Sequence, residues 1–159
     1  MGTFLQERVT KPLMKVLKSG ASPQSIALAL AFGVTGGVFP LPGITSVPVM
    51  LATIIFRLNP VAAMLTNYLA TPINVASFPL FIYYGNSIFG NEHTEKGFSI
   101  SQFTQDLKTD PLSTLLLFRF TLLNAIYLWM LCVPVMTLIL YLVLTPIVRR
   151  LIPSSKKHT

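Results

Sequence analysis

The chain has 159 residues, of which 52% are hydrophobic and 11% are charged, whereas soluble proteins typically contain about 25% charged residues. The net charge of +7 comes from cations at the two ends, without interleaved stacking aromatics, which argues against nucleic-acid binding. From Ser19 to Asn91 the only charged residue is Arg57, so an ordinary soluble core is excluded. The composition predicts an all-α integral membrane protein.

Residues 1–21 are predicted to form an amphipathic helix in the membrane interface, because their apolar side chains approximate one helical stripe with cations on the other faces. A basic tail, residues 153–159, ends the chain. By the positive-inside rule we expect both termini on the cytoplasmic side, where they contact anionic lipids. The membrane is either a bacterial inner membrane or a eukaryotic organelle membrane. In a eukaryote, Lys156 and Lys157 match a retrieval signal, and otherwise they form only a basic tail.

Residues 22–90 are predicted to form a membrane domain of two helix–break–helix units. Ser22 and Pro23 supply an N-cap and a favoured first helical residue, so the first helix begins there. Ala29, Gly33 and Gly37 follow at intervals of four residues. This spacing lets two helix backbones approach closely in lipid, although simple tolerance of Gly explains it equally well.

The first break falls at residues 38–43, Val-Phe-Pro-Leu-Pro-Gly, because two prolines lack amide donors and restrict the residues before them. Thr45 or Ser46 then caps a second helix, which has Pro48 in its first turn and runs to about Arg57. The unit is a re-entrant or broken membrane helix.

The second unit repeats this plan. Pro60 begins a helix, the run Thr71-Pro72-Ile73-Asn74 is predicted to break it, and Pro79 perturbs the helix beyond the break. Unpaired backbone inside a bilayer is tolerated only when it is buried in protein or lines a wet cavity. We therefore expect the two breaks to face each other or a shared crevice.

Residues 91–110 are predicted to be a polar loop, in which Phe98, Phe103 and Leu107 favour a short interfacial helix. Residues 111–152 are predicted to be one long transmembrane helix kinked near Pro134, with two short spans as the alternative. If the loop lies opposite the basic ends, one broken unit crosses the membrane and the other re-enters and returns. The sequence does not determine which of the two units crosses and which one re-enters.

Several motifs between Ser22 and Gly90 resemble a bacterial membrane family known as domain of unknown function 2062. The resemblance implies a membrane protein and brings no activity with it. The family commonly has an Asn-Pro pair at its second break, where this chain reads Thr71-Pro72. The motifs that carry the resemblance are Ser22-Pro23-Gln24-Ser25-Ile26-Ala27, the run from Gly33 to Gly43, Arg57-Leu58-Asn59, Asn67 and Thr71-Pro72.

The residue inventory argues against an enzyme, a cofactor or a metal site. His93 and His158 are the only histidines, and the apolar stretches contain no carboxylate. Glu92, His93 and Glu95 have ligand chemistry, but consecutive loop residues are more often simply solvated. Cys132 lies among apolar residues and is interpreted as a small buried hydrophobe.

The breaks themselves offer a different chemistry, since a helix N-terminus inside lipid presents unpaired amides and a partial positive charge. We therefore predict that a crevice between the breaks binds or translocates a phosphate-bearing lipid or a small anion. Each residue alone also fits a purely structural role. The alternative is a non-catalytic accessory or scaffold subunit, with the Ala29/Gly33/Gly37 stripe contacting other subunits or a second copy. The predicted substrate-binding residues are Pro40, Pro42, Gly43, Thr45, Ser46, Arg57, Asn67, Thr71, Pro72 and Asn74.

Overall fold

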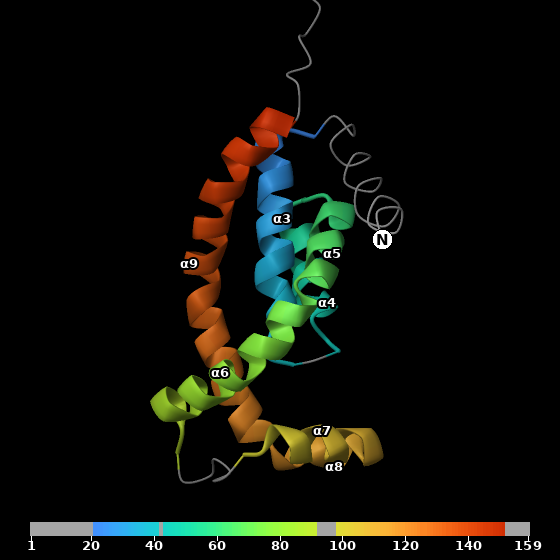
Figure 1. Ribbon diagram of the computed structural model, residues 1–159, viewed down its shortest axis with the longest axis vertical. Helices are drawn as coiled ribbons and strands as arrows, with labels where there is room; N and C mark the ends of the chain where they lie inside the picture. The colour runs from blue at the N-terminus through green and yellow to red at the C-terminus, as the bar shows by residue number, and fades with distance from the viewer. Residues whose placement is uncertain (1–20, 42, 92–97, 152–159) are drawn as a thin grey trace, which may run out of the picture.

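The computed structural model describes residues 21–41, 43–91 and 98–151, and these residues form seven helices without a strand (Figure 1). The predicted all-helical class is confirmed for them. The predicted interfacial helix at the N-terminus and the basic tail lie outside the described residues. The helices are α3 (Pro23–Gly37), α4 (Ser46–Ile55), α5 (Pro60–Leu69), α6 (Thr71–Phe89), α7 (Ile100–Thr109), α8 (Pro111–Leu117) and α9 (Arg119–Leu151).

Helices α3 and α4 form a hairpin around the first predicted break. The amide of Ser25 donates to Ser22 Oγ over 3.2 Å, with Pro23 in the first turn, so α3 begins where the sequence predicted. Gly36 lies against Val49, and the rings of Phe32 and Phe56 stack with centroids 4.9 Å apart. Residues late in α3 thus meet residues early in α4, and α4 runs back along α3.

The small residues of α3 face α5. A Cβ added to Gly33 would overlap Thr66 Oγ1 and the carbonyl oxygen of Ala63, and one added to Gly37 would lie 2.7 Å from Ala70 Cβ. Thr66 Oγ1 also donates to the carbonyl of Leu30 over 3.1 Å. Since the glycine face is filled from within the molecule, it is not free to contact another subunit.

The second break is smaller than predicted. Helix α5 ends at Leu69 and α6 begins at Thr71, so the run from Thr71 to Asn74 forms the first turn of a helix instead of a loop. Pro72 has no amide to offer the carbonyl of Tyr68, and the hydroxyl of Thr71 donates to that carbonyl over 2.8 Å. This local replacement turns a predicted break into a bend at Ala70. Helix α6 then continues through Pro79.

The loop after α6 contains a helix, as the sequence indicated. Ser99 caps α7 by accepting from the amide of Gln102, and Phe103 packs into a cluster of aromatic rings with Phe78, Phe98 and Phe118. The prediction of a single helix from residue 111 is wrong in one respect. The chain turns at Phe118 and divides that region into the short α8 and the long α9.

Helix α9 is the one described helix that is long and apolar enough to cross a membrane, and most of its surface is exposed. Trp129 Nε1 donates to the carbonyl of Thr35 over 2.9 Å, and Thr137 Oγ1 donates to Thr35 Oγ1 over 3.1 Å. Further along, Val148 joins the cluster around Ile26. Helix α9 therefore packs antiparallel to α3 along much of its length.

The two ends of the molecule differ. In Figure 1 the end of α9 lies beside the start of α3, while α7 and α8 lie across the opposite end. The α3–α4 hairpin returns to the end from which it came, whereas α5 and α6 together run from that end toward α7. Because α9 runs back again, the start of α3 and the end of α9 share one end of the fold.

Candidate functional site

The two interruptions meet in space through Asn74. This residue lies in the first turn of α6 and is almost fully buried, and its Nδ2 donates to the carbonyl of Phe39 over 2.8 Å. Phe39 belongs to the segment between α3 and α4. A side chain beside the α5–α6 bend therefore holds the backbone of the first break, and the predicted contact between the two interruptions is present.

A second contact joins α5 to the start of α4. Asn67 is 2% exposed, and its Nδ2 donates to Ser46 Oγ over 3.5 Å. Among the described residues its Oδ1 has no hydrogen-bond partner, although a buried amide oxygen normally has one. The N-cap residue Thr45 makes no side-chain bond to the amides of α4. The start of α4 is therefore polar and incompletely capped.

The chain between α3 and α4 closes on itself by short-range bonds. The amide of Leu41 donates to the carbonyl of Phe39, and the amide of Ile44 donates to that of Leu41. Pro40 is fully buried, whereas Gly43 is exposed and has a φ of +91°, a conformation that favours glycine. Pro42 lies outside the described residues.

We use the term "polar junction" for Phe39, Ser46, Asn67 and Asn74. Three other predicted site residues lie away from it. Arg57 is exposed at the far end of α4, with a φ of 51°, and Thr71 and Pro72 are exposed on α6. Helix α4 separates Arg57 from Ser46 by its whole length, about 15 Å, so the structure does not bring this predicted substrate-binding residue to the polar junction. The polar junction itself contains no formally charged residue.

Residues that sequence reasoning did not select form two further sets of polar contacts between helices. Thr35 on α3 accepts hydrogen bonds from Trp129 and Thr137, and Asn124 Nδ2 donates to Asn86 Oδ1 over 3.1 Å where α6 crosses α9. The side-chain chemistry could have indicated these contacts in the sequence. An indole or amide among apolar residues needs a partner once it is buried.

Metal chemistry has no support from the described residues, in which no three His, Cys, Asp or Glu side chains are grouped as a metal site would require. The consecutive Glu92, His93 and Glu95 lie outside these residues.

These features define a small all-helical protein in which polar side chains of two helices hold a broken helical hairpin. A family model described as "uncharacterized protein conserved in bacteria", domain of unknown function 2062, matches residues 6–158. The chain belongs to this family. The match extends the resemblance well beyond the motifs between Ser22 and Gly90. No curated protein and no solved structure matches the chain.

Proposed function

We propose that this protein is a non-catalytic integral membrane protein that binds or translocates a phosphate-bearing lipid at the polar junction. The observation that carries the proposal is the bond from Asn74 Nδ2 to the carbonyl of Phe39, because it places two interrupted helical units around one set of polar groups. Interrupted helices that meet inside a membrane are a common architecture for transport sites.

The surface of α9 supports a membrane setting. An apolar helix that forms the core of a soluble protein is mostly buried, but only 11% of the most apolar stretch of α9 is buried. The helix is about 50 Å long, which exceeds the roughly 30 Å hydrocarbon core, and it ends in Arg149 and Arg150. Helix α4 likewise exposes large apolar side chains, among them Leu51, Ile54 and Ile55.

Under this proposal each helical unit takes a defined path through the bilayer. The α3–α4 hairpin would enter the bilayer from the side on which α9 ends and return to it, while α5 with α6 crosses and α9 crosses back. This path satisfies the positive-inside rule, since Arg57, Arg149 and Arg150 then lie on one side. The proposal places that side in the cytoplasm.

The start of α4 supports an anionic ligand. Its positive dipole end faces the polar junction without a capping side chain, and Ser46 and Asn67 add neutral polar groups there. Arg57 acts at a different step in this proposal. At the membrane surface its guanidinium attracts anionic headgroups, and the polar junction receives them deeper in the fold.

Reconstitution in liposomes tests the proposal. We expect the full chain to accelerate the flipping of a fluorescent polyprenyl phosphate, and we expect Arg57→Ala to slow it. Arg119→Ala is the matched control, because Arg119 is also an exposed cation but is the first residue of α9, whereas Arg149 and Arg150 lie in its last turn. Flipping no faster than in empty vesicles, or an undiminished rate in Arg57→Ala, would remove the proposal.

A second function is favoured by one specific observation. The exposed face of α9 is apolar over many turns and suits a neighbouring protein helix as well as lipid. Under this alternative the protein is an accessory or scaffold subunit of a larger membrane assembly. Purification in a gentle detergent tests it, since a stable particle of this chain alone counts against a subunit role.

A further inference from the structure

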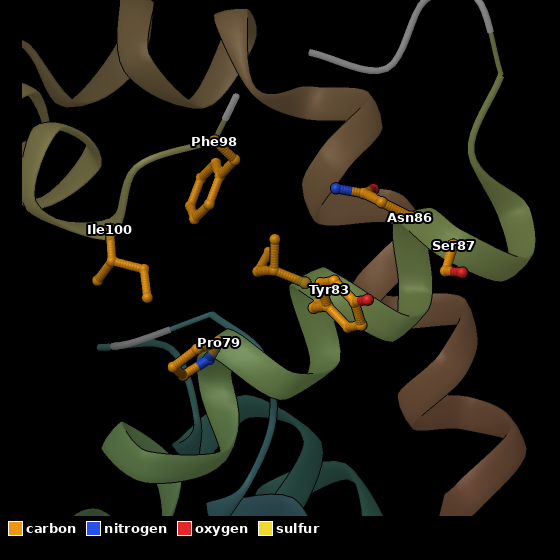
Figure 2. Close-up of a pocket in the computed structure, with 7 residues that line it drawn as sticks. Pro79, Tyr83, Asn86, Ser87, Phe98 and Ile100 are labelled. Carbon is orange, nitrogen blue, oxygen red and sulfur yellow. The ribbon is translucent and has the colours of Figure 1, made fainter. Parts of the chain in front are cut away.

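A cavity of about 420 Å³ opens between α6 and the segment that leads into α7, and none of the residues that line it belongs to the polar junction. Its volume falls within the range of roughly 300–1,000 Å³ that is typical of small-molecule sites. Figure 2 shows the side chains around it. The residues that line it are Pro79, Ile82, Tyr83, Asn86, Ser87, Phe98 and Ile100.

The two ends of the cavity differ in polarity. Asn86 and Ser87 lie at one end, and the hydroxyl of Tyr83 points toward them, whereas Pro79 and Ile100 lie at the other end (Figure 2). None of the seven lining residues carries a formal charge. A charged ligand would lose its hydration without gaining an ionic partner from the lining, so the cavity favours a neutral polar group.

Two of the lining side chains are held in place by neighbours outside the cavity. The ring of Phe98 contacts the rings of Phe103 and Phe118 at centroid distances of 5.4 and 5.3 Å. Asn86 Oδ1 accepts from Asn124 Nδ2, which orients the amide so that its nitrogen points toward the space below Phe98 (Figure 2). Preorganised groups lose little freedom when a ligand binds.

We propose that this cavity is a second ligand site, which binds a neutral group rich in hydroxyls, such as the sugar headgroup of a glycolipid. The rings of Tyr83 and Phe98 offer flat apolar surfaces to the C–H faces of a sugar ring, and the Asn86 amide and the hydroxyls of Ser87 and Tyr83 bind its hydroxyls. An attached acyl chain leaves past Pro79 toward the exposed Leu80.

The test measures binding of glucosyl diacylglycerol to the full chain in phosphatidylcholine nanodiscs. We expect Tyr83→Ala to weaken binding about tenfold, through loss of the ring surface. Tyr68→Ala is the matched control, because Tyr68 on α5 is a similarly exposed tyrosine and does not line the cavity. Asn86→Asp, which keeps the acceptor for Asn124 and removes the amide donor, is expected to weaken binding as well.

Equal losses in Tyr83→Ala and Tyr68→Ala would overturn the proposal, as would displacement of the glycolipid by phosphatidic acid at equal mole fraction. Competition with methyl glucoside distinguishes the two sources of the hydroxyl-bearing group. Displacement by the free sugar assigns the site to a soluble sugar, and resistance to it assigns the site to a lipid headgroup. Flipping of a polyprenyl phosphate is expected to be unchanged in Tyr83→Ala, so this test is independent of the polar junction.

Discussion

The two ends of this fold have cores of different side chains, although a glycine brings two helix backbones together at each, Gly33 in the α3–α5 contact and Gly85 in the α6–α9 contact. Around α3, α4 and α5 the core consists of aliphatic and small side chains, and glycines bring helix backbones together. Around α6, α7 and α8 the core is built mainly from phenylalanine rings. Helix α9 contributes to both clusters. Close backbone packing fails when a side chain grows, whereas aromatic packing fails when one is removed.

The largest expected effect lies in the α3–α5 contact. Gly33→Leu is expected to abolish the folded state, because even a Cβ at this position overlaps Thr66 and the backbone of Ala63. Thermal unfolding in detergent measures the result. Ala76→Leu is the control, since Ala76 is exposed on α6 and has room for a larger side chain. A Gly33→Leu protein as stable as the wild type would show that α3 and α5 do not pack closely.

The aromatic end is expected to lose stability when a ring is deleted. Phe103 is 2% exposed, so Phe103→Ala is expected to cost about 3–5 kcal/mol of unfolding free energy. Hydrogen exchange should show lost protection in α7 with little change in α3, because the two clusters are separate. Gln102→Ala serves as an exposed control on the same helix. Equal loss of protection in α3 would mean that the clusters unfold as one unit.

A smaller effect is expected at the polar junction. Asn74→Ala removes the bond to the carbonyl of Phe39, which still accepts from the amide of Leu41, so we expect a loss of about 1–2 kcal/mol. Thr71→Ala, one turn earlier and exposed, is expected to cost about 0.5 kcal/mol or less. Denaturant titration compares the two variants. If they are equally destabilised, the bond across the junction contributes no more than a local helix bond.

The smallest effect concerns the start of α8. Asp110 accepts hydrogen bonds from Ser113, and these hold the pKa of the exposed carboxyl below its ordinary value. Because the pKa is lower in the folded state, the stabilisation is present above the unfolded pKa and is lost as the pH falls through the folded one. The amide shift of Ser113 in an NMR titration follows this loss. Asp110→Asn should keep the hydrogen bond that caps α8, and the amide shift of Ser113 should then no longer change with pH in this range.

Helix starts were predictable from the sequence because their causes are local. Ser22 with Pro23, and Asn59 with Pro60, place a capping side chain before a proline, and α3 and α5 begin there. The first break could also be predicted from the sequence, since two prolines and a glycine lie within four residues. The hydrogen bond from Asn74 to this break joins residues 35 positions apart in the sequence. The sequence predicted only that the two breaks meet, and it did not identify this bond.

The errors arose where a neighbouring group compensated for a helix-breaking residue. Pro72 was predicted to break the second unit, but Thr71 satisfies the carbonyl that Pro72 leaves open, and the helix resumes at once. Phe118, in contrast, turns the chain without any proline or glycine at that position. Its ring packs against Phe98 and Phe103, so tertiary packing determines the turn. Arg57 was selected because it is the only charged residue between Ser19 and Asn91, a choice that did not depend on its position in the fold.

The indole of Trp129 gives this protein an internal optical reporter. It is the single tryptophan of the chain, and its N–H is bonded to the carbonyl of Thr35 in the contact between α3 and α9. Any substrate or lipid that separates these two helices must break this bond and change the surroundings of the ring. The emission wavelength of the unlabelled protein therefore records, without an engineered probe, whether α9 moves away from the hairpin when a lipid or another ligand is added.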